Sequence, residues 1–249
     1  MKNNRSYCLS IAGYDPTAGA GVLADVKTFE MFQVYGMAII TSNTLQTDDR
    51  FLSVQWMDIE TIKNQMETLF SKYDFKALKI GLVENFDTLQ QIVLLAKKLN
   101  PTIQIVWDPI LKSSSGFDFH SNTSLKLIFL EENCSLITPN WNEFASLWGN
   151  DPDILLDRKL NTSILIKGGH RQGKKGCDLL YIHGDFVKID GISFHGKSKH
   201  GTGCVLSAAI AAYLAKGNDL INSCTQAKQY VEQFILSNET NLGYHYDNK

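Results

Sequence analysis

The chain has 249 residues, of which 44% are hydrophobic and 20% are charged, and its formal net charge is −2. This length can bury the core of one α/β domain, so we expect a single domain over residues 1–249. The charge balance gives no electrostatic reason to expect nucleic acid or an anionic membrane as a partner. No apolar run reaches the length of a membrane span.

Cysteine usage and the start of the chain both favour the cytoplasm. The five cysteines are an odd number, widely scattered, and no two form a Cys-x-x-Cys pair. A disulfide framework or a zinc site is therefore not expected. The polar residues 1–5 lead into what reads as a first strand, without the features of a signal peptide.

Short β-rich segments alternate with amphipathic segments along the chain. Strands are predicted at residues 7–12, 35–41, 77–80, 103–107, 135–138 and 164–166. Helices are predicted at residues 22–32, 59–70, 86–99, 205–214 and 221–236. Two further segments, 177–182 and 186–189, flank a turn at 183–185 and predict a hairpin. The alternation predicts a mostly parallel sheet with helices on both faces, a three-layer αβα sandwich.

The clearest functional signal is a glycine-rich turn, His200-Gly201-Thr202-Gly203-Cys204, that leads into an apolar helix. Backbone N–H groups left unpaired at a helix start, together with the helix dipole, favour bound anions. Cys204 at that position is expected to have a lowered pKa, and its thiolate could accept the proton of a substrate hydroxyl. The alternative is that Cys204 is a small packing residue. The pattern favours a phosphate-handling enzyme.

Several polar or glycine residues directly follow predicted strands, and the carboxyl ends of parallel strands share one edge of a sheet. These residues are Gly13, Gly81, Asp108, Asn140 and Lys167. Asp108 and Glu143 supply the oxygen ligands that suit Mg²⁺, although Asn140 and Glu143 could equally form a helix capping box. Lys167 could contact phosphates, or it could be an ordinary surface lysine. The loop 13–21 could hold a ligand or be a tight turn alone.

Taken together, these segments resemble the hydroxymethylpyrimidine/phosphomethylpyrimidine kinases of thiamine biosynthesis, which belong to the ribokinase-like superfamily. The resemblance runs from Ser10 to about Tyr230, and the order and spacing of its motifs agree throughout. Its carriers are Ile11-Ala12-Gly13-Tyr14-Asp15-Pro16, Gly19-Ala20-Gly21 with Ala24-Asp25, Val34-Tyr35-Gly36-Met37, Gln46, Lys79-Ile80-Gly81, Asp108-Pro109, Thr138-Pro139-Asn140 with Glu143, Lys167-Gly168-Gly169-His170, and the segment 200–204 followed by Leu206–Ala212.

The resemblance implies a ribokinase-like fold and two successive ATP-dependent phosphorylations, first of hydroxymethylpyrimidine and then of its monophosphate. It implies that Cys204 is the base, within an anion hole formed by Gly201, Thr202, Gly203 and Cys204. The substrate residues that it implies are Gly13, Ala20, Asp25, Thr44, Gln46, Leu82 and Ile110. It places Lys167, Gly169 and Asn140 near the nucleotide, and Asp108 and Glu143 at Mg²⁺. Members of the family usually form homodimers.

Two other functions stay open at this point. Pyridoxal kinases share the Gly-Thr-Gly-Cys site and also phosphorylate a primary alcohol on a flat heteroaromatic ring, although Gln46 favours the aminopyrimidine edge. A catalytically silent pyrimidine-binding protein is the third interpretation. Its support is limited to departures from the family pattern, such as Tyr14 and Leu23 in the first loop and helix.

Overall fold

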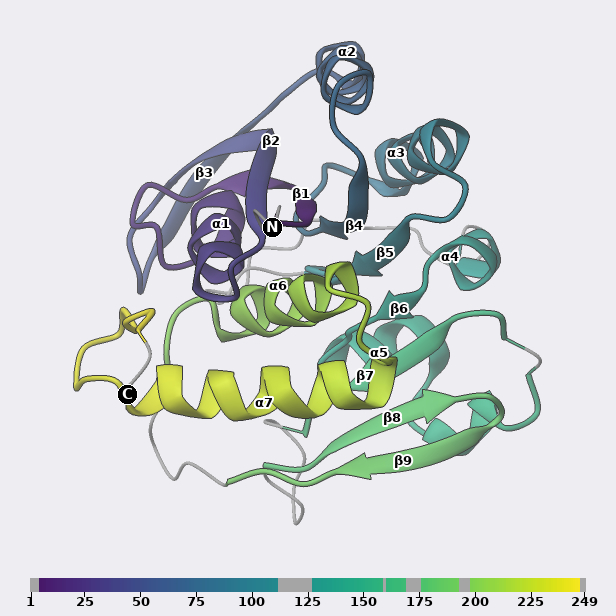
Figure 1. Ribbon diagram of the computed structural model, residues 1–249. Helices are drawn as coiled ribbons and strands as arrows, with labels where there is room; N and C mark the ends of the chain where they lie inside the picture. Colours follow the sequence, from purple (N-terminus) through teal and green to yellow (C-terminus); the bar gives the residue numbers. More distant parts are fainter. Residues whose placement is uncertain (1–4, 112–126, 159, 169–175, 193–197, 247–249) are drawn as a thin grey trace.

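The computed structural model describes residues 5–111, 127–158, 160–168, 176–192 and 198–246, and these build a sheet between two layers of helices (Figure 1). Nine strands form one sheet in the order β3-β2-β1-β4-β5-β6-β7-β8-β9. The six inner strands pair in parallel, whereas β3 at one edge and the β8–β9 pair at the other are antiparallel. The mostly parallel αβα architecture expected from the sequence is confirmed.

The strands are β1 (Tyr7–Tyr14), β2 (Tyr35–Gln46), β3 (Phe51–Trp56), β4 (Phe75–Ile80), β5 (Gln104–Trp107), β6 (Leu136–Ile137), β7 (Ser163–Ile166), β8 (Asp178–Ile182) and β9 (Asp185–Ile189). The α-helices are α1 (Gly21–Met31), α2 (Ile59–Phe70), α3 (Phe86–Leu99), α4 (Leu127–Asn133), α5 (Trp141–Trp148), α6 (Thr202–Ala215) and α7 (Leu220–Leu236), and a 3₁₀ turn covers Pro152–Leu155. None of the described helices is long and apolar enough to cross a membrane.

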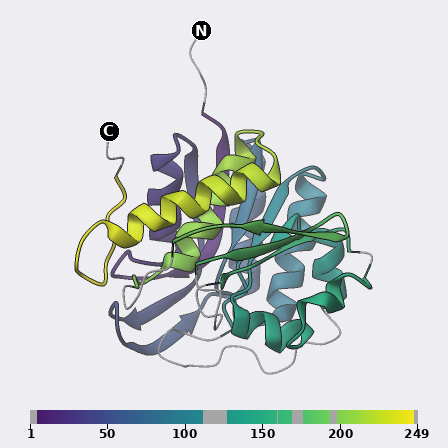
Figure 2. The same ribbon diagram turned by 90° about the horizontal axis from the view of Figure 1, so that it is seen from below.

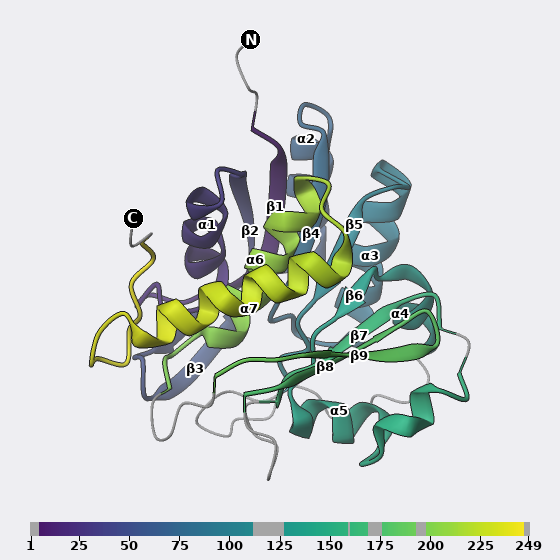
Figure 3. The same ribbon diagram turned by 60° about the horizontal axis from the view of Figure 1, so that its bottom comes forward.

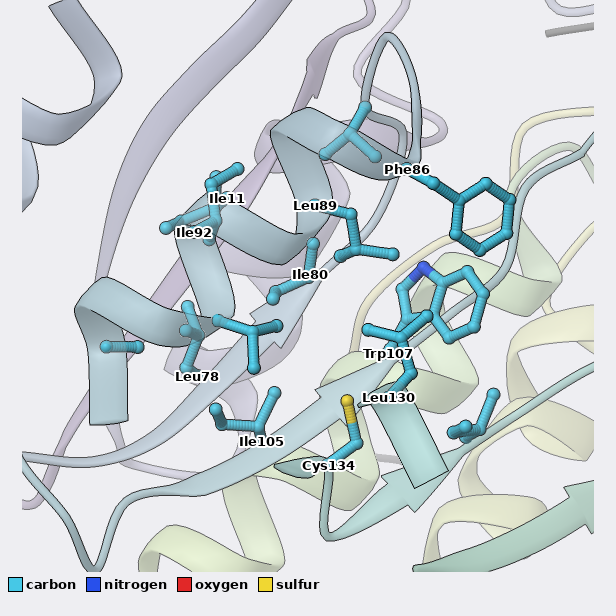
Figure 4. Close-up of a cluster of buried hydrophobic side chains, with 14 of the residues drawn as sticks. Ile11, Leu78, Ile80, Phe86, Leu89, Ile92, Ile105, Trp107, Leu130 and Cys134 are labelled. Carbon is cyan, nitrogen blue, oxygen red and sulfur yellow. The ribbon is translucent and has the colours of Figure 1, made fainter. Parts of the chain in front are cut away.

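Alternating side chains of the inner strands pack into two separate hydrophobic cores, one on each face of the sheet. On β1, Leu9 and Ile11 point to the core beneath α2, α3, α4 and α5, whereas Cys8 belongs to the core beneath α1, α6 and α7. Figure 4 shows the first of these cores, where Trp107 and Phe86 meet edge to face between strand and helix. Because both faces of the sheet are covered, the inner strands are nearly continuous apolar segments.

Helix α6 is buried on almost every side. It lies between the sheet and α7, and α7 crosses its outer surface (Figures 2 and 3). Small side chains permit this close packing, and the fully buried ones include Ala208, Ala209, Ala211 and Ala212. The helix that carries Cys204 is therefore anchored in the core.

Two parts of the fold differ from the sequence-based expectation. Strand β2 continues to Gln46 and pairs with β3, so the two form an antiparallel ribbon at the edge of the sheet that was not predicted. Helix α4 was not predicted either. The β8–β9 hairpin was predicted correctly, and its two turn residues, His183 and Gly184, both have positive φ angles, as a two-residue hairpin turn requires.

The chain after α7 folds back on that helix and partly buries a histidine. His245 Nδ1 lies 2.9 Å from Tyr230 Oη, and its ring packs 4.9 Å from the ring of Phe234. Burial, with a smaller contribution from the charge of Lys27, lowers the pKa of His245 to about 4. The unfolded chain would bind this proton near pH 6.5.

This histidine should make the protein acid-sensitive. Between pH 6.5 and 4 the unfolded state binds a proton that the folded state does not, so the free energy of unfolding falls as the pH falls through that window. A His245→Phe variant keeps a ring against Phe234 but cannot titrate. Urea unfolding at about pH 7 and about pH 4.5 should show a smaller loss of stability for the variant than for the wild type. Equal losses in the two proteins would mean that other groups account for the acid sensitivity.

Candidate active site

The carboxyl ends of the inner strands lie together at one edge of the sheet, as expected. Backbone hydrogen bonds continue from strand to strand beyond the last paired residues, from Gly81 N to Ile11 O, Asp108 N to Ile80 O, Thr138 N to Trp107 O and Lys167 N to Pro139 O, each 2.9 Å long. Asn140 and Lys167 add an isolated parallel bridge. This edge therefore brings together the polar residues that follow β1, β4, β5, β6 and β7.

The first loop is organised around the buried carboxylate of Asp15. Its oxygens accept hydrogen bonds from the backbone N–H groups of Thr17 and Ala20, both at 2.9 Å, and from the hydroxyl of Thr17. His200 Nε2 lies 2.8 Å from Asp15 Oδ2 and so links this loop to the glycine-rich turn. Burial by itself raises the pKa of Asp15, but the hydrogen bonds from His200 and Thr17 outweigh it and the pKa is lowered.

The glycine-rich turn packs directly against the first loop. Gly201 has φ +77°, in the left-handed region, and a Cβ at this position would lie 1.9 Å from the carbonyl oxygen of Gly19. Only glycine fits such a position without displacing the neighbouring loop. Gly201 is the N-cap of α6, and no side chain caps the helix start. The first backbone N–H groups of α6 therefore remain available to an anion.

Cys204 lies in the first turn of α6 and is only 6% exposed. The backbone of Gly21, at the start of α1, favours the ionised form of its thiol. Burial raises the pKa of Cys204 to about 11, against the opposing effect of the nearby Lys79 ammonium. The expectation of a lowered pKa was therefore wrong, because desolvation outweighs the helix start and the neighbouring positive charge.

Lys167 lies between two carboxylates next to this turn. Its Nζ is 2.8 Å from Asp108 Oδ1 and 4.0 Å from Glu143 Oε2. A Cβ at Gly203 would lie 3.4 Å from the same Nζ, so the lysine faces the anion hole. With a side chain only 15% exposed, Lys167 is not the solvated surface lysine of the alternative interpretation.

The two carboxylates have opposite pKa shifts. Burial of Asp108 is outweighed by the charges of Lys167 and Lys79, and its pKa is lowered. Hydroxyl groups of Thr138 and Ser207 also bond this carboxylate, each at 3.2 Å. Burial dominates at Glu143 and raises its pKa to about 7 in spite of Lys167. Asp108 is thus the firmly ionised member of the pair.

Asn140 and Glu143 form the capping box that was the alternative to a metal-binding role. Asn140 Oδ1 accepts from the backbone of Glu143 at 2.9 Å, and Glu143 Oε2 accepts from the backbone of Asn140 at 2.7 Å. Because the capping box uses only Oε2 of Glu143, Oε1 could still bind a cation. Within the described residues no three His, Cys, Asp or Glu side chains converge as a metal site. A cation here would need phosphate oxygens or water to complete its ligands, as Mg²⁺ commonly does.

A buried ion pair beneath the site was not recognised from the residues alone. Lys79 on β4 and Asp25 on α1 are both fully buried, and Lys79 Nζ lies 2.8 Å from Asp25 Oδ2. Ser10 donates a further hydrogen bond to the same carboxylate. Burial by itself lowers the pKa of Lys79, but the charges of Asp25, Cys204 and Asp108 outweigh it and the pKa is raised. Asp25 was expected to contact the substrate, but its carboxylate is bound by Lys79 and Ser10 inside the protein core.

Four of the other expected substrate residues, Gly13, Ala20, Thr44 and Leu82, lie in or beside the first loop. Thr44 donates to the carbonyl of Tyr14 at 2.9 Å, and half-buried Gln46 ends β2. The remaining residues are Gly13 at the end of β1 beside Leu82, Ala20 as the N-cap of α1, and half-buried Ile110 beyond β5. Gly169, expected near the nucleotide, lies outside the described residues.

A family model for phosphomethylpyrimidine kinase matches residues 15–248. The hydroxymethylpyrimidine/phosphomethylpyrimidine kinase of Aquifex aeolicus is 34% identical over 250 residues, covering 96% of this chain and 97% of that protein.

Two solved structures share the fold along most of their length. A pyridoxal kinase from Staphylococcus aureus, in complex with ADP, superposes with a TM-score of 0.83 at 25% identity, covering 97% of this chain and 92% of that one. A phosphomethylpyrimidine kinase from Clostridium difficile 630 superposes with a TM-score of 0.75 at 31% identity, covering 92% of this chain and 99% of that one. These likenesses confirm the ribokinase-like fold. The extent of the sequence match shows that this chain belongs to the phosphomethylpyrimidine kinase family.

Proposed function

We propose that the protein uses ATP to phosphorylate hydroxymethylpyrimidine and then converts the monophosphate to the diphosphate. The observation that carries this proposal is the position of Cys204, whose thiol lies at an uncapped helix start between the first loop and the Lys167–Asp108 pair. The proposed proton acceptor, Cys204, therefore lies next to the backbone N–H groups that would bind the phosphoryl group. The names of the sequence relatives support the choice of substrate.

In this mechanism Cys204 accepts the proton of the substrate hydroxyl as that oxygen attacks the terminal phosphorus of ATP. The backbone N–H groups of Gly203 and Cys204 stabilise the charge on the transferring phosphoryl group. Lys167, which faces the same turn, adds a positive charge on the nucleotide side. The amide of Gln46 can both donate to and accept from the aminopyrimidine edge.

Mg²⁺ fits the same edge of the sheet. Asp108 and Glu143 provide the hard oxygen ligands that this ion prefers, and the lowered pKa of Asp108 keeps that carboxylate ionised. When bound, Mg²⁺ would neutralise charge on the phosphate oxygens of ATP. We assign Asp108 and Glu143 to hold it, with Asn140 positioning Glu143 through the capping box.

Pyridoxal phosphorylation is the second candidate, and the structural likeness to a pyridoxal kinase favours it specifically. The same base and anion hole would serve that reaction unchanged.

The cysteines of the described chain are all free, which suits the reducing cytoplasm that we propose as the location of the protein. We also propose a homodimer, which light scattering of the purified protein would test.

Turnover with each acceptor should separate these functions. With Mg²⁺-ATP, we expect the purified protein to consume ATP on addition of hydroxymethylpyrimidine and to favour it over pyridoxal in kcat/KM. Mass spectrometry of the products should show the monophosphate first and the diphosphate later. A preference for pyridoxal would move the protein to the second function. Binding of the pyrimidine without ATP turnover would instead indicate a catalytically silent binding protein.

A further inference from the structure

The chain immediately after α7 folds into a compact turn of five residues, Asn238–Leu242, which we call the C-terminal turn. Asn238 organises it from within. Its Oδ1 accepts from the backbone and the hydroxyl of Thr240, at 2.7 and 2.8 Å, and its Nδ2 donates to the carbonyl of Leu242 at 2.9 Å. As a result, several carbonyl oxygens of this turn point toward one place.

The ammonium group of Lys199 occupies that place. Lys199 is only 7% exposed, and its Nζ donates to Asn238 O at 2.6 Å, to Asn238 Oδ1 at 2.9 Å and to Thr240 O. All three acceptors are neutral oxygens of the backbone or of an amide. Three oxygens around one buried positive charge match the three donors of an ammonium group, and carbonyl oxygens are also ligands of K⁺.

The same turn is joined to the anion hole through the next residue in sequence. The backbone N–H of His200 donates to Asn241 O at 2.9 Å, while the His200 ring pairs with Asp15 of the first loop. The C-terminal turn also reaches the first loop directly, because a Cβ at Gly19 would lie 2.7 Å from Leu242 Cδ2. The residues that precede Gly201 are thus held from both sides.

We propose that Lys199 is a positioning residue, a tethered cation that orders the C-terminal turn and thereby fixes the backbone of the anion hole. The proposal rests on the proposed kinase function. The chain would then supply its own monovalent charge at this place, so that turnover needs the Lys199 ammonium and no free monovalent cation. Loss of the charge would leave the oxygens facing one another and would let the turn before Gly201 shift.

A Lys199→Met variant tests this directly, with Lys216→Met at the exposed far end of α6 as its matched control. We expect kcat of Lys199→Met to fall by about 10²-fold, the usual effect of a misplacement of about 1 Å, with little change in the KM of the pyrimidine. In buffers of constant ionic strength made with tetramethylammonium, added NH₄⁺ or K⁺ should restore much of the loss, because a small ion can enter the oxygen cage. Lys216→Met should behave like the wild type.

Two measurements keep the test independent of the acceptor and of the folding of the variant. The thermal unfolding midpoint of Lys199→Met should rise with added NH₄⁺ or K⁺, and this readout needs no substrate, so it survives failure of the proposed function. Wild-type turnover should be the same in tetramethylammonium as in K⁺. A variant with wild-type kcat, a folded inactive variant that no cation restores or stabilises, or a wild type that needs K⁺ would each overturn the proposal.

Discussion

Replacing Cys204 with alanine is expected to lower turnover of the pyrimidine by about 10²- to 10⁴-fold, the usual contribution of a general base. The residual rate would come from the anion hole and from substrate positioning, which the substitution leaves in place. Steady-state ATP consumption and the Kd of ATP should be measured together, because we expect only the first to change.

Cys224→Ala is the matched control for this variant. Cys224 is buried as well, at 1% exposure, but it lies on α7, in the core beneath α1, α6 and α7 and away from the helix start. Each substitution removes one sulfur atom from a buried position, so the two losses of stability should be of similar size. Only Cys204→Ala should lose activity. Wild-type turnover in that variant would show that another group accepts the proton.

The pH dependence of turnover checks the same assignment without relying on the size of the loss. The pKa of Cys204 is raised to about 11, so near neutral pH only a small fraction of the thiol is ionised. Below that pKa the thiolate fraction grows about tenfold with each pH unit. Turnover by the wild type should therefore rise with pH until another step limits the rate, and the residual turnover of Cys204→Ala should not follow this rise.

Breaking the buried ion pair should have the largest effect on stability. A Lys79→Met variant leaves the Asp25 carboxylate fully buried without its partner, and removal of one member of such a pair costs about 3–5 kcal/mol. Ser10 still donates one hydrogen bond to Asp25 but cannot replace a positive charge. Urea unfolding followed by circular dichroism gives the free energy of unfolding directly.

Lys76→Met provides a control on the same strand. Lys76 pairs with Asp74, but both side chains are more than half exposed, so the denaturation midpoint should change little. The double variant Lys79→Met with Asp25→Asn should recover part of the stability, because no unpaired charge remains buried. If the double variant is less stable than Lys79→Met alone, desolvation of Asp25 is not the cause of the loss.

The order of elements could be predicted from the sequence because the inner strands and the helices carry strong apolar patterns. The predicted helix at residues 86–99 has the same bounds as α3, since Asn85 caps its start and Pro101 follows its end. The ribbon was missed for the opposite reason. Ser42, Asn43 and Thr44 are polar, and the end of β2 is held as a strand by pairing with β3 instead of by burial in a helix-covered core.

The site could be predicted in outline, since the residues that follow parallel strands must meet at one edge. The residues alone did not predict the pKa shifts and the buried ion pair at that edge. Cys204 was assigned a lowered pKa from its place at a helix start, but the surrounding core decides the sign. The pairing of Lys79 with Asp25 links residues 54 positions apart. A lysine inside the otherwise apolar predicted strand 77–80 was its only local signal.

The different surroundings of β2 and α6 imply that chemistry and selectivity can change separately in this fold. Cys204 is a buried residue of a helix packed on almost every side, where even a small increase in side-chain volume would be resisted. Gln46 lies at the tip of a two-stranded ribbon on the margin of the sheet, between the exposed residues Leu45 and Thr47. With Gln46 at the acceptor, as we propose, substitutions on the ribbon would retune acceptor preference while the reaction stays intact. Such a division would let one scaffold diversify among vitamin precursors through mutations at its periphery.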